Sequence, residues 1–284
     1  MKTLLKLIFG KNGYFFLIFS AHRMLYKKIV AGIIKRSPYN VALFLLSINS
    51  VKKIKFGFDK KKQLFFVREN EVKHYFTNAF RGNWLFQKGL FNRGLTLCKS
   101  YGIDKISIKP DDIIIDVGAN YGDLGIYLRK FGSKLYGFEP DPEPFQALKE
   151  NNYHKVFNMA CSDRKGTSKL YIYSSHADSS LIANNLDKKY IEVETDTLDN
   201  LFREKSKIKL IKIEAEGFEP EILKGSLDII KKTEFICVDG GPERGPKNAQ
   251  TIEELVNILT DNNFNLLFLN DSGRALFSNN KFNN

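Results

Sequence analysis

A short apolar run followed at once by a glycine-containing turn is the feature that most restricts the fold of this 284-residue chain. The run Ile113–Val117 is of the kind found in strands that are covered on both faces, as in a parallel sheet. The turn Gly118–Gly122 comes next, and Asp123–Phe131 has the pattern of a helix. A strand that leads through a tight glycine turn into a helix is the opening unit of a doubly wound sheet.

Strand and helix patterns continue to alternate after this unit. Such alternation predicts a doubly wound, Rossmann-like α/β sheet. Near the C-terminus, Asn270–Gly273 has the composition of a hairpin turn, so we expect the sheet to end in an antiparallel pair. The expected later strands are Lys134–Glu139, Lys155–Ala160, Ser168–Tyr173, Tyr190–Glu194, Ile208–Ile213, Glu234–Asp239, Asn265–Leu269 and Ala275–Ser278.

Most of the net charge of +12 lies at the N-terminus. Residues 1–62 contain fourteen Lys or Arg and one acid, Asp59, whereas the rest of the chain has a net charge of −1. The apolar patches there are too short for a membrane-spanning helix, and no signal-peptide pattern is present. A helical cap with a solvated basic face, contact with an anionic membrane surface, and nucleic-acid binding all remain open, but no nucleic-acid module accompanies the charge.

The first 104 residues are expected to form a basic extension of helix and hairpin, and residues 105–284 are expected to form the α/β domain. The pattern up to about residue 50 is helical, and Ile54–Phe58 and Gln63–Arg68 predict a hairpin. A second short pair of strands is expected around Glu71–Phe76, and one helix over Asn83–Tyr101.

The glycine turn lies at the carboxyl end of the first strand, where open α/β sheets bind ligands. Gly118 and Gly122 allow a tight turn and let backbone N–H groups approach a ligand. Their spacing is Gly-x-x-x-Gly, so the pyrophosphate-binding fingerprint Gly-x-Gly-x-x-Gly is incomplete and a nicotinamide-dependent oxidoreductase is disfavoured. The ammonium group of S-adenosylmethionine is instead a partner that Asp116 can complement.

Glu139 ends the next strand, 21 residues after Gly118, where a carboxylate can accept hydrogen bonds from ribose hydroxyls. The alternative is that it caps the helix beginning at Pro142. After the third strand a polar side chain can bond the adenine amino group, although Asp163 is also a common turn former. The residues expected to bind a nucleoside cofactor are Asp116, Gly118, Asn120, Gly122, Glu139, Pro140, Ser162 and Asp163.

Several short motifs carry a family resemblance: Ile115–Gly122, Gly137–Pro140, Ala160–Asp163, Thr197–Asp199, Ile211–Glu219 and Leu223–Gly225. Through them, residues 105–275 resemble the FkbM family of methyltransferases. The resemblance implies S-adenosyl-L-methionine as the cofactor and a seven-stranded sheet with a reversed last strand. It also implies O-methylation of sugars, glycans or polyketide-like products. The family typically has Asp where this chain has Glu214, a carboxylate one methylene longer.

Methylation of an alcohol needs a proton acceptor beside the reacting oxygen. Glu214, Glu216 and Asp239 lie at the ends of predicted strands and are the first candidates. His176, in a polar loop, is the second candidate, with an exposed loop histidine as the alternative. Glu216 can instead complement a helix dipole. The same acids can hold Mg²⁺, but their spacing is not diagnostic and we assign no metal.

The chain is thus expected to be a methyltransferase that acts on a hydroxyl of a sugar, glycan or natural-product-like acceptor. The alternative is a noncatalytic adenosyl-binding subunit of a membrane-associated glycan-synthesis complex. Cys98, Cys161 and Cys237 lie far apart, without zinc-site spacing, and indicate buried thiols in a reducing compartment. We therefore expect a cytoplasmic protein, with contact at the inner membrane face as an option for residues 1–62.

Overall fold

The computed structural model describes residues 54–172, 179–183 and 189–282. Within those residues, no helix combines the length and the apolar character that crossing a membrane requires. Most of the basic segment, residues 1–53, lies outside the described residues, and so does the loop that carries His176. The expectation of membrane contact therefore stays a prediction.

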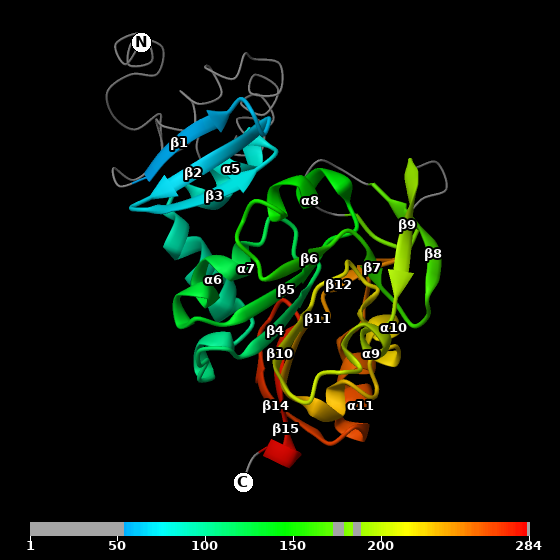
Figure 1. The fold of residues 1–284 in the computed structure, drawn as a ribbon. Coiled ribbons are helices and arrows are strands. Elements are labelled where there is room, and N and C mark those ends of the chain that lie inside the picture. Colours follow the sequence, from blue (N-terminus) through cyan, green and yellow to red (C-terminus); the bar gives the residue numbers. More distant parts are fainter. Residues whose placement is uncertain (1–53, 173–178, 184–188, 283–284) are drawn as a thin grey trace, which may run out of the picture.

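A seven-stranded sheet forms the centre of the described chain (Figure 1). Its strand order is β14-β15-β11-β10-β4-β5-β6, and β15 runs antiparallel to both of its neighbours. The predicted doubly wound α/β sheet with an antiparallel final strand is confirmed. The strands are β4 (Ile113–Val117), β5 (Lys134–Phe138), β6 (Lys155–Phe157), β10 (Ile208–Ile213), β11 (Thr233–Asp239), β14 (Phe264–Leu269) and β15 (Arg274–Asn279).

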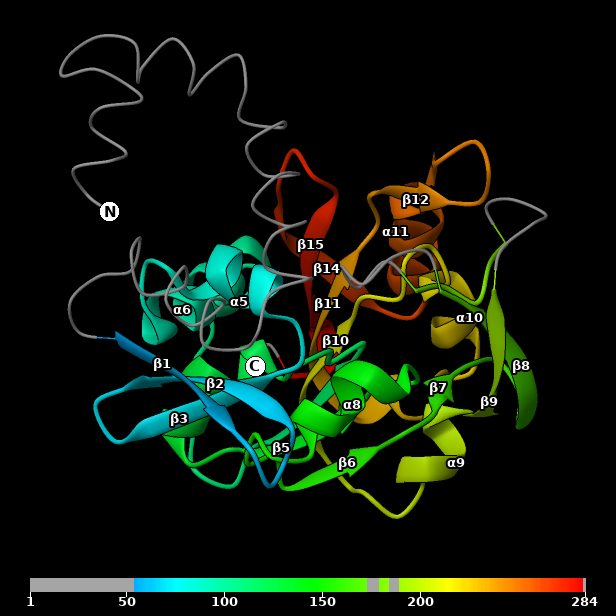
Figure 2. The ribbon, with the colours of Figure 1, turned by 90° about the horizontal axis from the view of Figure 1, so that it is seen from above.

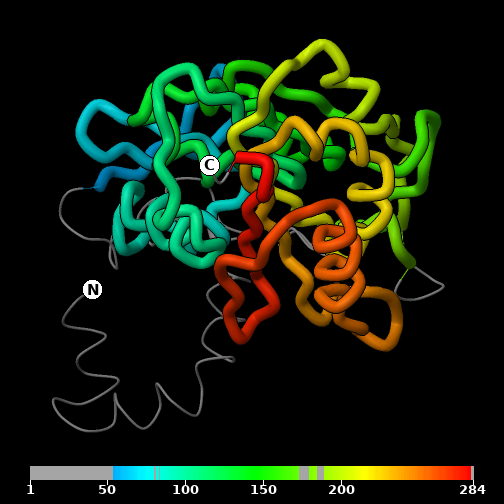
Figure 3. The backbone as a smooth tube through the Cα atoms, turned by 90° about the horizontal axis from the view of Figure 1, so that it is seen from below, coloured from blue at the N-terminus to red at the C-terminus, as the bar shows by residue number. Residues whose placement is uncertain are grey.

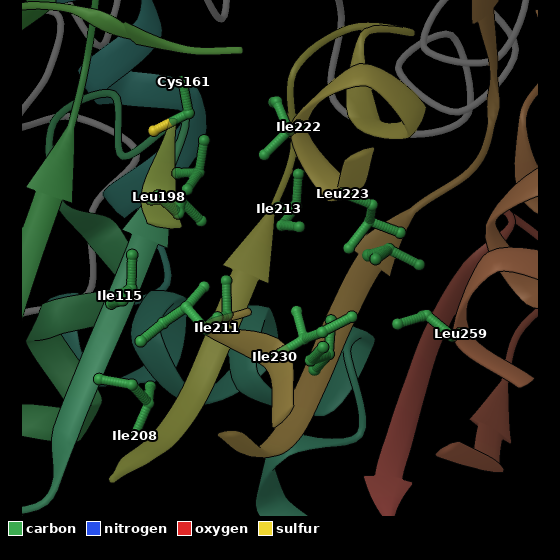
Figure 4. Close-up of a cluster of buried hydrophobic side chains, with 14 of the residues drawn as sticks. Ile115, Cys161, Leu198, Ile208, Ile211, Ile213, Ile222, Leu223, Ile230 and Leu259 are labelled. Carbon is green, nitrogen blue, oxygen red and sulfur yellow. The ribbon is translucent and has the colours of Figure 1, made fainter. Parts of the chain in front are cut away.

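Both faces of this sheet are covered, which explains the apolar run in β4. Successive side chains of a strand point to opposite faces. Ile114 packs with side chains of one apolar cluster, and Ile115 packs with another cluster on the opposite face. Figure 4 shows part of the second cluster, which includes Ile115, Ile211 and Ile213 of the strands and, near Ile213, Ile222 of the covering helix.

Helices from different parts of the chain cover the two faces. On the face of Ile114 lie α6 (Leu90–Ser100) and α7 (Asp123–Leu128). On the other face lie α9 (Leu198–Phe202), α10 (Glu219–Lys224) and α11 (Ile252–Asp261). Figures 2 and 3 show the two groups on opposite sides of the central strands, with α11 in orange. Helix α8 (Pro142–Leu148) follows β5, and the Asp141 side chain caps its first turn.

The N-terminal part of the described chain is a three-stranded antiparallel sheet. It contains β1 (Ile54–Asp59), β2 (Leu64–Glu69) and β3 (Val72–Phe76). The predicted hairpin matches β1 and β2, but a single third strand replaces the expected second pair. Figure 1 shows this sheet beside α5 (Ala79–Phe86), apart from the seven-stranded sheet.

The single helix expected over Asn83–Tyr101 is two helices, α5 and α6. The chain breaks at Gly89, whose φ of 108° lies outside the helical region. A carboxylate from β2 stabilises the new start, because Glu69 Oε2 accepts hydrogen bonds from the backbone N–H groups of Leu90 and Phe91 at 2.7 and 3.1 Å. The cap lies 21 residues earlier in the chain, so local periodicity does not reveal it.

Two small sheets complete the fold. One has the order β7-β9-β8, with β7 (Ala160–Cys161), β8 (Gly166–Tyr171) and β9 (Tyr190–Asp196). The other is a hairpin of β12 (Pro242–Arg244) and β13 (Ala249–Gln250), directly after β11. This hairpin matters for the site, because it brings a further acidic residue to the end of the main sheet.

Candidate functional site

A cavity of about 490 Å³ lies at the carboxyl ends of β4, β5 and β10. Strands β4 and β10 are neighbours in the sheet. The strand that follows β4 in the main sheet, β5, lies on one side of this pair, and the strand that follows β10, β11, lies on the other side. Open α/β sheets bind ligands at such a switch point. The volume falls in the range of roughly 300–1,000 Å³ that is usual for small-molecule sites. Residues of α5 and α6 close the cavity on one side.

Glycine is required at position 118 because two strands approach each other closely there. The φ of Gly118 is 71°, in the left-handed region. A Cβ atom on Gly118 would lie 1.8 Å from the backbone carbonyl oxygen of Glu214. In turn, the Glu214 backbone N–H donates to the Val117 carbonyl at 3.2 Å. Gly118 therefore lets the ends of β4 and β10 meet at the cavity.

The rest of the turn is fixed by local geometry. Asn120 has a φ of 50°, and its backbone N–H donates to Glu139 Oε2 at 2.8 Å. Gly122, with a φ of 79°, precedes α7, and a Cβ atom there would lie 2.7 Å from the Tyr153 ring. Gly118 and Asn120 line the cavity, whereas Gly122 is not among its lining residues and serves the packing of the turn.

Glu139 is buried at the end of β5, with 6% of its surface exposed, and lines the cavity. Its Oε1 accepts from the Asp141 backbone N–H at 2.9 Å, and its Oε2 accepts from Asn120. Burial raises the pKa of Glu139 to about 7, and the Asp141 N–H opposes this shift. A carboxylate has about four acceptor positions, so this fixed group keeps capacity for two ligand hydroxyls.

Beyond Glu139 the wall becomes apolar. Phe138, Met159, Ala160 and Leu170 line this part, next to Pro140. Phe138 is itself held by a stacked contact with Phe157, at 4.6 Å between ring centroids. A flat heterocycle is suited to such surroundings.

Ser162 and Asp163 are not among the lining residues. The Ser162 backbone N–H donates to the Asp196 carbonyl at 3.0 Å, and its hydroxyl donates to Asp163 Oδ1 at 3.0 Å. The loop also packs tightly on Gly225, where a Cβ atom would lie 2.0 Å from the Ser162 carbonyl oxygen. Ser162 and Asp163 thus contact other protein groups and do not line the cavity.

Five charged side chains of alternating sign follow the ends of the central strands. We call them the charge row: Asp116, Lys212, Glu214, Arg274 and Asp239. Lys212 lies 3.1 Å from Asp116 Oδ1 and 3.0 Å from Glu214 Oε2, with 3% of its side chain exposed. Arg274 lies 3.0 Å from Glu214 Oε1 and 2.6 Å from Asp239 Oδ2. The Lys212 ammonium also donates to the Gly118 carbonyl at 2.9 Å.

Within the charge row, Lys212 and Glu214 are held in their ionised forms, whereas burial raises the pKa of Asp116 above its ordinary value. Burial opposes the charge on Lys212, but Asp116 and Glu214 outweigh it and raise the pKa of Lys212. Burial would likewise raise the pKa of Glu214, yet Lys212 and Arg274 lower it to about 2. Tyr153 donates its hydroxyl to Asp116 Oδ2 at 2.6 Å. The row therefore stabilises the strand ends rather than offering a base that takes up protons at neutral pH.

The four predicted proton acceptors have different surroundings. Glu214 lines the cavity within two ion pairs, and Asp239 is not a lining residue. Both Asp239 oxygens accept hydrogen bonds, from Arg274 and from the Gly241 N–H. Glu216 lines the cavity with a φ of 51°. His176 lies outside the described residues. No group of three His, Cys, Asp or Glu that could hold a metal occurs in the described residues.

A further carboxyl group in the wall, Glu243, was not found by sequence reasoning. It lies on β12, and within the described part of the chain its buried Oε2 has no hydrogen-bond partner. Burial, together with the negative charges of Asp239, Glu219 and Glu214, raises the pKa of Glu243 to about 8. Arg274 opposes this shift. Glu243 is thus poised to exchange a proton near neutral pH.

The neighbouring residue fixes Glu243 in place. Arg244 makes a bidentate ion pair with Glu221 of α10, at 2.6 and 2.9 Å. Its guanidinium also donates to the Gly217 carbonyl at 2.6 Å. The β12 hairpin is therefore tied to the loop between β10 and α10. The only signal for this connection in the sequence is the pair of opposite charges that follows Pro242. That pattern is typical of an ordinary polar turn.

The N-terminal segment also contributes to the wall. Arg81, Trp84 and Leu85 come from α5, and Arg93 and Leu97 from α6. Arg93 donates to Asp123 Oδ2 at 2.7 Å, which links α6 to the start of α7. The sequence boundary proposed at residue 104 thus does not separate the cavity from the extension, because residues on both sides of it line the same space.

The strand order, the glycine turn and the buried carboxylate at the end of β5 define a class I methyltransferase fold with a nucleoside-cofactor site. Residues 116–266 match the model of the methyltransferase FkbM domain. The chain belongs to the FkbM methyltransferase family, whose cofactor is S-adenosyl-L-methionine. The family resemblance inferred from the sequence motifs is confirmed.

Two curated relatives are similar over about half of the chain. Hexuronic acid methyltransferase AglP of Haloferax volcanii is 28% identical over 147 residues, 50% of this chain and 61% of that protein. The 2-O-methyltransferase NoeI of Sinorhizobium fredii is 29% identical over 155 residues, 46% of this chain and 64% of that protein. The similarity thus covers less than two thirds of either relative.

Among solved structures, a magnesium protoporphyrin IX methyltransferase from Synechocystis PCC 6803 with bound SAM is 11% identical, with a TM-score of 0.39. The match covers 89% of this chain and 96% of that chain.

The residues of the cavity fit S-adenosyl-L-methionine. The described lining contains seven carboxylates and four basic side chains, a balance that suits a ligand with a sulfonium and an ammonium group. Glu139 would hold the ribose, and the apolar wall around Met159 would hold the adenine. Asp141, one of these seven carboxylates, lies next to Glu139, to which its backbone N–H donates.

Replacing Glu139 with alanine is expected to weaken cofactor binding by about 1–3 kcal/mol, because the ribose hydroxyls and two backbone N–H groups lose their acceptor. Calorimetry with S-adenosylhomocysteine measures the change. Glu192→Ala on the exposed side of β9 is the matched control and should bind like the wild type. An unchanged dissociation constant for the Glu139 variant would remove Glu139 from the site.

Proposed function

We propose that this protein is an S-adenosyl-L-methionine-dependent O-methyltransferase that methylates a hydroxyl of a sugar, glycan or natural-product-like acceptor. The observation that carries the proposal is Glu243, a carboxyl group in the cavity wall with one buried oxygen that has no hydrogen-bond partner among the described residues. A hydroxyl is a weak nucleophile and reacts best when its proton is removed during the transfer. A carboxyl group whose pKa is about 8 is well matched to that task.

S-adenosyl-L-methionine supplies an electrophilic methyl group on its sulfonium. In the proposed reaction the bond between sulfur and methyl carbon breaks as the acceptor oxygen bonds to that carbon, and the hydroxyl proton passes to the Glu243 carboxylate. Glu139 and the glycine turn position the adenosyl part, while the charge row keeps the strand ends rigid. Positioning the two reactants in line provides much of the rate enhancement of such displacements.

Two other ionisable groups in the wall, Lys212 and Glu214, are less suited to take the proton. Lys212 is held as an ammonium ion between two carboxylates, and a protonated amine cannot act as a base. Glu214 is a weak base because its pKa is lowered to about 2. Glu216 also lines the cavity, and a variant at that position distinguishes the two carboxylates.

The function is tested by incubating the full chain with S-adenosylmethionine labelled in the methyl group and with fractionated cell extracts. Glycan, lipid, small-molecule and protein fractions are counted separately. Label in an alkali-stable ether of a glycan or small molecule is the expected result. Tight cofactor binding without transfer to any fraction would favour a noncatalytic adenosyl-binding subunit. Failure to bind S-adenosylmethionine at sub-millimolar concentration would reject the proposal.

A further inference from the structure

We propose that helix α5 forms an acceptor subsite in which the indole of Trp84 stacks on the face of a pyranose ring. The proposal rests on the proposed function, and it assigns acceptor recognition to residues that precede the family domain at 116–266.

Trp84 combines two properties that seldom occur together. Its surface is 60% exposed, and it lines the same cavity as Glu139 and Glu243. A large aromatic side chain usually buries most of its surface. An indole that is exposed at the edge of a cavity therefore offers a flat apolar face to a ligand that enters there.

Helix α5 is held firmly enough to act as a platform. Phe86 and Leu85 are buried on the side of the N-terminal sheet. Gly82 packs directly on the Phe76 ring, where a Cβ atom would lie 2.1 Å away. Just before the helix, Thr77 Oγ1 forms hydrogen bonds with Tyr121 Oη at 2.9 Å and with Glu143 Oε1 at 3.1 Å. The position of Trp84 is thus coupled to the glycine turn and to α8.

The polar residues that line the rest of the cavity indicate what kind of ring stacks on the indole. Glu216 and Glu243 contribute acceptors, and Arg93 contributes donors, to the cavity that Trp84 lines. A pyranose has a face of C–H groups and a rim of hydroxyls that both donate and accept. A phenol has one hydroxyl, so it would leave several polar groups of the wall without partners, which costs binding free energy. The combination favours the sugar ring.

The subsite also has a consequence for specificity. The cofactor-binding turn and Glu139 belong to the family domain, but Trp84 and Arg81 belong to the segment before it. Variation in α5 can therefore change the acceptor without disturbing the cofactor. Binding of S-adenosylhomocysteine should accordingly be insensitive to substitutions at Trp84.

Trp84 is the single tryptophan of the chain, so its emission reports directly on the subsite. The full chain, saturated with S-adenosylhomocysteine, is titrated with the methyl glycosides of glucose, galactose, mannose, rhamnose, fucose and xylose. At least one pyranoside is expected to change the emission saturably and to protect Trp84 from acrylamide quenching. Calorimetry with the same glycoside should show roughly tenfold weaker binding for Trp84→Ala. Trp84→Phe, which keeps an aromatic face, should bind within about threefold of the wild type.

Tyr190→Ala removes another exposed aromatic side chain, outside the cavity, and serves as the matched control. The proposal is overturned if no pyranoside alters the emission, if Trp84→Ala binds like the wild type, or if catechol protects Trp84 while the glycosides do not. These outcomes are distinct from a failure of the proposed function, which would appear as lost S-adenosylhomocysteine binding or as absent methyl transfer by the wild type.

Discussion

Replacing Lys212 with methionine is expected to lower the free energy of unfolding by about 3–5 kcal/mol, because the change leaves the buried Asp116 carboxylate without its counter-ion and removes one of the two cations that pair with Glu214. Asp116 and Glu214 both contact the Lys212 ammonium, and Asp116 is fully buried. The carbonyl of Gly118 loses a donor as well. Urea unfolding, monitored by circular dichroism, measures the difference.

Lys224→Met is the control for this experiment. Lys224 pairs with Glu254 at 2.8 Å, but both side chains are about half exposed, so the expected change is at most about 1 kcal/mol. Equal effects of the two substitutions would contradict the stabilising role assigned to the charge row. A double variant, Asp116→Asn with Lys212→Met, should recover part of the lost stability because one unpaired charge is removed.

The effect of Lys212→Met should also depend on pH. The pKa of Glu214 is lowered from its ordinary 4.5 to about 2, so its stabilising contribution is present above pH 4.5. That contribution is lost as the pH falls from 4.5 towards 2, because the carboxyl group then becomes protonated in the folded state. The difference in stability between wild type and variant should therefore narrow over this interval.

Replacing Glu243 with glutamine should reduce kcat/KM for methyl transfer by roughly 10²–10⁴-fold, the usual contribution of a general base. Glutamine keeps the size of the side chain but cannot take up the hydroxyl proton. Below pH 8 the wild-type carboxyl group is increasingly protonated, so the wild-type rate should rise with pH and level off above about pH 8. The rate of the Glu243→Gln variant should not show this rise with pH.

The assay uses an acceptor that the wild type methylates, with S-adenosylhomocysteine affinity as a second measurement. Glu253→Gln, at an exposed position of α11, should behave like the wild type in both. Cofactor affinity should also be unchanged in the Glu243 variant. If that variant retains full activity while Glu216→Gln loses it, the proton acceptor is Glu216.

The sheet was predictable because its strands carry local signals. Ile114 and Ile115 are apolar since each faces a different covered side of β4, and the glycine turn follows directly. The buried carboxylate Glu139 was predictable for the same reason, as its position at a strand end is local information. The start of α6 after Gly89 could not be predicted, because it depends on a cap from Glu69, which is distant in the sequence.

The charge row shows why much of the site could not be predicted. Lys212 lies in β10 directly opposite Asp116 in β4, a register that no single segment reveals. In the sequence it reads as an ordinary polar residue among isoleucines. Arg274 reaches Glu214 only because β15 inserts between β11 and β14. Glu243 was missed because its significance lies in a buried oxygen without a hydrogen-bond partner in the described part of the chain, which becomes visible only in three dimensions.

The insertion of β15 has a consequence for synthesis of the protein. On the ribosome this strand emerges after every other strand of the central sheet, and with it comes the guanidinium of Arg274. Before Arg274 has been added, Glu214 and Asp239 lack the cation that links them. A product that ends before Arg274 would therefore lack the link between Glu214 and Asp239 in the charge row.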